Sequence, residues 1–114
     1  MRLSLGRDDQ VLLREAAAYM ARRMRGPGDV ARLGEIEDRL DALLIAAAPG
    51  VGPLELDRPE ARVLRTALGS YAEMLSAPGS DSSNRARVAR LRGIDRRIGA
   101  GLGWRARLFG WLRG

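Results

Sequence analysis

Apolar residues recur at steps of three and four along four stretches of the chain, and this spacing predicts four amphipathic helices. In the first stretch Leu13, Ala17, Met20 and Met24 follow steps of four, three and four, and the pattern ends at the Gly-Pro-Gly of residues 26–28. The other three stripes are formed by Leu33, Ile36, Leu40, Leu43, Leu44 and Ala47, by Leu64, Leu68, Tyr71 and Leu75, and by Val88, Leu91, Ile94 and Ile98.

Residues typical of helix ends flank these stripes. Asp29 is the expected N-cap of the second helix, and Asn84 that of the fourth. Asp57 and Glu60 have the spacing of a capping box, which places the start of the third helix. The fourth helix is expected to stop within the glycine-rich residues 99–103.

The chain also repeats itself. Residues 3–24 match residues 54–75 at an offset of 51, and residues 30–39 match residues 88–97 at an offset of 58. Both offsets keep the apolar positions in phase, which favours duplication over coincidence in a chain rich in Arg, Ala and Leu. The identical pairs are Leu3/Leu54, Leu5/Leu56, Arg7/Arg58, Leu13/Leu64, Arg14/Arg65, Ala16/Ala67, Ala21/Ala72, Val30/Val88, Ala31/Ala89, Arg32/Arg90, Leu33/Leu91, Ile36/Ile94 and Arg39/Arg97.

A Leu-x-Leu segment precedes the first helix of each repeat. Residues 3–5 and 54–56 alternate as short strands do, and two such copies could pair. A hydrophobic staple that holds the chain onto the following helix explains three residues equally well.

These patterns predict an all-α protein in which two duplicated helical hairpins form a four-helix bundle, followed by a short C-terminal amphipathic helix. Residues 1–102 are expected to form a single helical domain, with repeat units at about 3–48 and 54–102. Residues 103–114 form a separate Trp- and Arg-rich tail in this interpretation.

The composition argues against an enzyme. The chain contains no histidine and no cysteine, and all 20 basic residues are arginine. It therefore lacks the imidazole, thiol and amine groups that most often act as bases, nucleophiles or zinc ligands. We expect no cofactor and no metal, and we interpret the acidic cluster on the second helix as a solvated face, formed by Glu35, Glu37, Asp38 and Asp41.

Positive charge is concentrated near the C-terminus. The net charge of the chain is +6, and residues 85–114 contain nine arginines and one acidic residue. Arg85, Arg92 and Arg96 lie on one side of the fourth helix and form a basic ridge that could follow nucleic-acid phosphates. Alternatively, the second helix lies antiparallel to the fourth, and its Glu37 and Asp41 pair with part of this ridge.

The tail holds both tryptophans and the only phenylalanine of the chain. Drawn as a helix, it places an apolar face beside arginines, which suits a partner's groove or a membrane surface. The alternative is a tail that folds back and closes the open end of the bundle. The candidate partner-binding residues are Trp104, Arg105, Arg107, Leu108, Phe109, Trp111 and Leu112.

We therefore expect a non-catalytic cytoplasmic protein that binds a partner protein, or a second copy of itself, through the fourth helix and the tail. The expectation of a cytoplasmic location follows from a start without an apolar signal region and from the lack of a spanning apolar stretch. Binding of nucleic acid through the ridge and binding of an anionic membrane surface through the tail are the two alternatives.

Overall fold

The computed structural model describes the backbone of residues 1–46, 52–79 and 81–113, and the side chains of these residues up to residue 102. The fold is mostly helical, as the apolar spacing predicts, and it also contains two short strands. The elements follow one another as β1 (Arg2–Leu5), α1 (Arg7–Ala21), α2 (Pro27–Ile45), β2 (Gly52–Glu55), α3 (Arg58–Leu75) and α4 (Ser82–Arg113).

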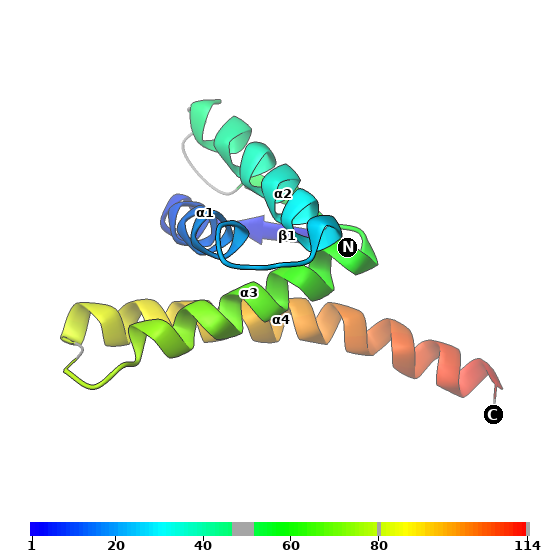
Figure 1. Cartoon of the computed structure of the whole chain (residues 1–114). Coiled ribbons are helices and arrows are strands. Elements are labelled where there is room, and N and C mark those ends of the chain that lie inside the picture. The colour runs from blue at the N-terminus through cyan, green and yellow to red at the C-terminus, as the bar shows by residue number, and fades with distance from the viewer. Residues whose placement is uncertain (47–51, 80, 114) are drawn as a thin grey trace.

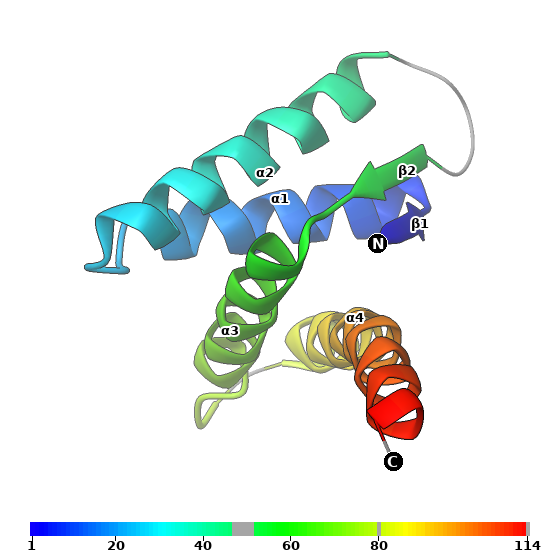
Figure 2. The ribbon, with the colours of Figure 1, turned by 90° about the vertical axis from the view of Figure 1, so that its right-hand side faces the viewer.

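The strands β1 and β2 pair in an antiparallel two-stranded ribbon, which the views in Figures 1 and 2 show beside α1. Leu3 lies opposite Leu54 at the centre of the pairing. The flanking pairs are Arg2 with Glu55, Ser4 with Pro53, and Leu5 with Gly52. The strand interpretation of the Leu-x-Leu segments is therefore confirmed, and the pairing brings together residues about 50 positions apart in the sequence.

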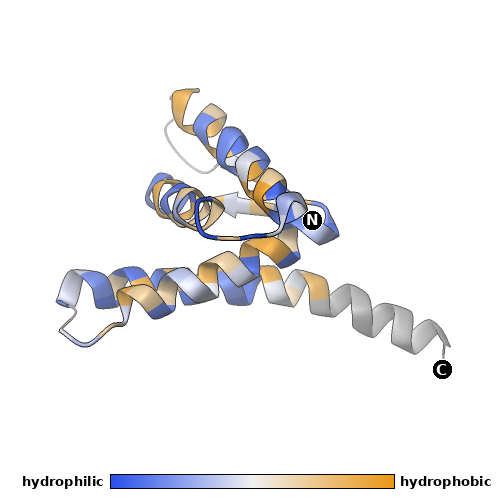
Figure 3. Cartoon of the chain, in the orientation of Figure 1, coloured by the Kyte–Doolittle hydropathy of each residue, from blue (hydrophilic) through white to orange (hydrophobic). Residues whose placement is uncertain are grey.

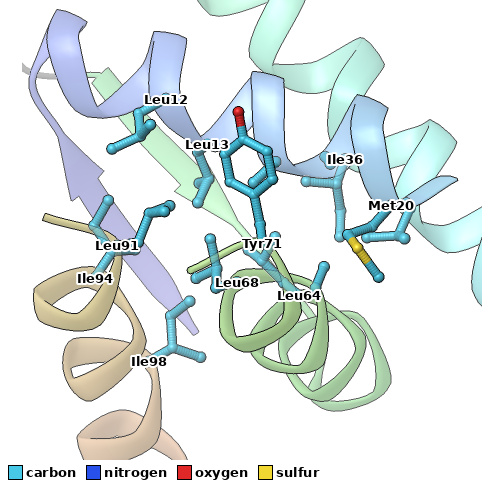
Figure 4. Close-up of a cluster of buried hydrophobic side chains, with 14 of the residues drawn as sticks. Leu12, Leu13, Met20, Ile36, Leu64, Leu68, Tyr71, Leu91, Ile94 and Ile98 are labelled. Carbon is cyan, nitrogen blue, oxygen red and sulfur yellow. The ribbon is translucent and has the colours of Figure 1, made fainter. Parts of the chain in front are cut away.

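The hydrophobic core lies beneath the ribbon and between the helices. The side chains of Leu3, Leu5, Leu54 and Leu56 all enter it, because alternate residues of a strand point to the same face. Figure 4 shows the apolar side chains that meet there from all four helices, namely Leu12, Leu13, Met20, Ile36, Leu64, Leu68, Tyr71, Leu91, Ile94 and Ile98.

The helices form two hairpins, α1 with α2 and α3 with α4, which meet through α1 and α3. Figure 1 shows α1 nearly end-on while α3 and α4 run across the view, so the hairpins cross at a large angle. Hydrophobic residues of α3 gather where this helix passes the first hairpin (Figure 3). The predicted four-helix bundle, with its nearly parallel helices, is not confirmed by this crossing arrangement.

Helices α2 and α4 begin earlier than predicted, whereas α3 begins where the capping box predicts. Helix α2 begins at Pro27 with Gly26 as N-cap, two residues before the position that Asp29 predicts. A proline is favourable there because its missing N–H would have no partner in the first turn. Helix α3 begins as predicted: the Asp57 carboxylate accepts from the Glu60 N–H at 2.8 Å, and the Glu60 carboxylate accepts from the Asp57 N–H at 2.9 Å.

Helix α4 starts earlier and ends later than predicted. Its first turn is capped by Asp81, whose carboxylate accepts from the Asn84 N–H at 2.9 Å, so Asn84 is inside the helix. The helix then continues through residues 99–103 to Arg113, and the expected separate tail helix is the end of α4. Glycine lowers helix stability by about 1 kcal/mol but causes no clash, so packing of the buried Ile98 can offset it.

A glycine is required where β2 begins. An added Cβ at Gly52 would lie 2.8 Å from the Gln10 Nε2 atom and 3.3 Å from the Leu43 side chain. Gln10 cannot move freely, because it is buried and its Nε2 donates to the Leu5 carbonyl oxygen at 2.9 Å. The close packing of Gln10 of α1 against β2 thus depends on a glycine, which has no side chain, at position 52.

Candidate functional site

The outer side of the ribbon is a small surface built by both strands. Alternation buries Leu3 and Leu54, and it exposes the side chains between and beside them. We call this surface the ribbon face and define it by its exposed residues Arg2, Ser4, Pro53 and Glu55. Among the described residues, no helix covers these four side chains.

Two arginines hold the edges of the ribbon from opposite sides. Arg39 of α2 donates from Nη1 to the Glu55 carbonyl oxygen at 3.0 Å. Arg97 of α4 donates from Nη2 to the Ser4 carbonyl oxygen. Both side chains are exposed, so each guanidinium is fixed by a backbone acceptor while part of it remains accessible to solvent.

Arg39 also forms an ion pair with the buried carboxylate of Glu60, at 2.7 Å between Nη2 and Oε2. Burial by itself raises the pKa of the Glu60 carboxyl, since a charge is less stable away from water. The hydrogen bonds from Arg39 and from the Asp57 N–H outweigh burial, and the pKa of Glu60 is lowered. A shallow cavity of about 420 Å³ adjoins this pair and is lined by Met1, Arg39, Glu55, Leu56, Asp57 and Glu60.

We expect the substitution Arg39→Ala to destabilise the fold by about 1–3 kcal/mol at pH 7, because it leaves the buried Glu60 carboxylate without its cation. Because the pKa of Glu60 is lowered in the folded protein, its carboxylate stabilises the fold at pH values above the unfolded pKa. This contribution is lost as the pH falls through the folded pKa. Without Arg39 the strongest interaction that lowers the pKa of Glu60 is lost, so the carboxylate stabilises the fold less at pH 7. Denaturation of both proteins should show a difference that shrinks between pH 7 and pH 3.

The control for this prediction is Arg39→Ala in a Glu60→Gln background. Here the buried group does not titrate, so the effect of the arginine should be the same at both pH values. An equal loss at pH 7 and pH 3 in the natural background would contradict the assignment of the ion pair.

Two further arginines follow the strands directly. Arg7 begins α1 after β1, and Arg58 begins α3 after β2; both are exposed. Within the described part of the chain neither of them, nor Arg2, lies within ion-pair distance of a carboxylate. Unpaired guanidinium groups therefore lie on or close to the ribbon face.

The basic ridge of α4 is exposed, and the predicted partners from α2 do not reach it. Asp41 forms an ion pair with Arg14 of α1 instead. Among the described side chains, the acidic residues that pair with arginines of α4 come from α1: Glu15 pairs with Arg87, and Asp9 pairs with Arg90 at 3.1 Å. Between α1 and α4 lies a groove of about 490 Å³ lined by Asp8, Val11, Leu12, Glu15, Ser83, Arg87 and Arg90.

Arg85, Arg92 and Arg96 form no ion pair among the described residues and are all exposed. At about 100° per residue, Arg96 points to a different side of α4 than its neighbour Arg97, which reaches the ribbon. Among the described arginines of α4, Arg97 rather than a ridge residue donates a hydrogen bond to the ribbon.

The candidate residues of the tail fall in the last turns of α4, from Trp104 to Leu112. Their side chains lie outside the described residues, and the prediction that they bind a partner remains a prediction. The residues of the ribbon face were not singled out by sequence reasoning. The available signals were the alternation of residues 3–5 and 54–56 and the repeat pair Arg39/Arg97.

Comparison with protein-family models, with curated proteins and with solved structures found no match for this chain. Among the described residues, acidic side chains do not gather in a group that could hold a metal ion. None of the described helices combines the length and the apolar character needed to cross a membrane.

Proposed function

We propose that this protein binds duplex DNA and inserts the ribbon face into the major groove. The observation that carries this proposal is a two-stranded ribbon with one face buried in the core and the other exposed. The major groove of B-DNA is about 12 Å wide and admits such a ribbon, whose strands are about 4.8 Å apart.

The exposed side chains have the chemistry that base edges require. Arg2 can donate two hydrogen bonds to guanine, Glu55 can accept from the cytosine amino group, and Ser4 can donate or accept. They stand on strands held by the core, so the backbone that carries them is ordered before binding.

Charge around the ribbon supports the same ligand. Arg7 and Arg58 at the starts of the two helices, and Arg97 at the ribbon edge, are exposed cations that suit the phosphates bordering a groove. Glu55 is the single carboxylate of the ribbon face. Of the acidic residues that follow β2, Asp57 caps α3 through its carboxylate, and Glu60 is neutralised by Arg39.

We also infer that the two halves of the chain are copies of one strand-helix-helix unit. Supporting this, the repeat offset of 51 takes Leu3 to Leu54, its own partner at the centre of the ribbon. The offset of 58 takes Arg39 to Arg97, and the offset of 51 takes Ser4 to Glu55. The hydrogen bond from Arg39 to the Glu55 carbonyl is therefore equivalent to the one from Arg97 to the Ser4 carbonyl. A pseudo-twofold axis through the ribbon would account for both observations.

The proposal is tested by binding of a labelled duplex at 50 mM salt and at increasing salt. If Arg7, Arg58 and Arg97 each neutralise one phosphate, the logarithm of the affinity should fall with the logarithm of the salt concentration with a slope of about −2.7. The variants Arg58→Ala and Arg97→Ala should each reduce this slope by about one.

Arg22→Ala is the matched control, because Arg22 is an exposed arginine at the other end of α1, about 20 Å along the helix from the ribbon. It should leave the slope unchanged. Absence of a complex at 50 mM salt, or equal slopes in all four proteins, would overturn the proposal. Deletion of residues 103–114 in the same assay separates this role from partner binding through the tail, which remains a prediction.

A further inference from the structure

We infer that the DNA site recognised by one copy of this chain is not palindromic: one half specifies a G·C base pair through Arg2 and Glu55, and the other half discriminates weakly. This inference rests on the DNA-binding role proposed above. It adds the symmetry of the target and the residues that determine it.

The backbone of the ribbon is symmetric about its centre. The repeat offset of 51 exchanges Leu3 with Leu54, which lie opposite one another. It therefore exchanges the cross-strand pair Arg2–Glu55 with the pair Ser4–Pro53 on the other side of the centre. A duplex lying along the ribbon would meet one of these pairs in each half of its site.

The supports of the two ends are also equivalent. Leu43 of α2 lies 3.3 Å from the Cβ position of Gly52, and the corresponding contact on the other side joins Met1 to Gly101 of α4. Arg39 and Arg97 bind equivalent carbonyl oxygens. Both ends of the ribbon face should consequently reach the same depth in a groove, so that differences in reading come from the outward side chains.

Those side chains differ in chemistry at the two ends. At one end Arg2 and Glu55 combine a guanidinium that recognises the O6 and N7 atoms of guanine with a carboxylate that recognises the N4 amino group of cytosine. At the other end the Ser4 hydroxyl can donate or accept a hydrogen bond with any base, and Pro53 offers only apolar contact, for example with a thymine methyl group. A symmetric scaffold with unlike ends reads an asymmetric sequence.

The stoichiometry follows from the same geometry. Proteins that bind palindromic sites do so because two identical chains present identical residues to the two half-sites. Here one chain supplies both strands of the ribbon, with different residues at equivalent positions. One copy should therefore occupy one site.

The test is selection of tight-binding duplexes from a randomised pool, with the natural protein and with Arg2→Ala, Ser4→Ala and the control Arg22→Ala. We expect one motif that differs from its own reverse complement, with a fixed G·C pair in one half, and a complex of one chain per duplex. Arg2→Ala should lower discrimination at that pair by about 10- to 100-fold, while Ser4→Ala and Arg22→Ala leave it unchanged.

The possible failures are distinguishable. Retention of no duplex at 50 mM salt would overturn the DNA-binding role itself. A palindromic motif, two chains per duplex, or binding without any enriched motif would leave DNA binding intact and overturn the asymmetric reading. All three substituted residues are exposed, so unfolding by these substitutions is not expected, and circular dichroism of each variant checks this.

Discussion

Replacement of Leu54 by alanine is expected to lower the free energy of unfolding by about 2–5 kcal/mol. The Leu54 side chain is 1% exposed and lies opposite Leu3, which is 3% exposed, in the pair that joins the two halves of the chain. The substitution removes buried apolar contacts and leaves a cavity where helices and ribbon meet. Because small domains are stable by only about 5–15 kcal/mol, the loss is a large part of the total.

Chemical denaturation provides the measurement, and the neighbouring Glu55→Ala provides the control. Glu55 is exposed on the same strand, so its substitution should change stability by no more than about 0.5 kcal/mol. The pair can also be examined by combining Leu54→Ala with Leu3→Ala. Since the two side chains oppose one another, the double variant should lose less than the sum of the single losses. Equal effects of Leu54→Ala and Glu55→Ala would contradict the observed burial.

The substitution Ser4→Glu is expected to weaken duplex binding by about 100-fold at low salt while leaving the fold intact. Ser4 is exposed at the end of the ribbon face that carries no charge, and a carboxylate there would face the negative potential of the groove. The loss should be largest at low salt, where electrostatic repulsion is least screened.

Thr66→Glu is the matched control for Ser4→Glu. Thr66 is exposed on α3, outside the ribbon face, and the substitution changes the net charge by the same amount. It should reduce affinity several-fold less than Ser4→Glu does. If both variants lost affinity equally, net charge rather than the ribbon face would govern binding, and the proposed docking surface would be wrong.

Much of the helical part of the fold could be predicted from the sequence. The spacing of apolar residues in each helix is long and regular, and such a pattern determines which side of a helix is buried. The capping box of Asp57 and Glu60 was also recognisable, because both partners are local in the sequence. The ends of α4 were not, since the glycines of residues 99–103 read as a stop while tertiary packing carried the helix through them.

The ribbon illustrates why the candidate site was harder to predict. Three alternating residues are too few to distinguish a strand from a staple, and a short strand is stable only when a partner supplies its hydrogen bonds. That partner lies about 50 residues away. The ion pairs of α4 show the same limit: Asp9 and Glu15 of α1 contact it, rather than the acidic residues of α2, because the hairpins cross.

The sequence by itself determined the four helices, their buried faces and the lack of histidine, cysteine and lysine, because these depend on residue identity and on spacing over a few turns. Only the tertiary structure decided that the Leu-x-Leu segments pair, that Arg39 and Arg97 flank them, and that Arg2, Ser4, Pro53 and Glu55 form one exposed surface. The reason is that pairing between distant segments is fixed by the packing of the whole core, which buries one face of the ribbon and thereby exposes the other.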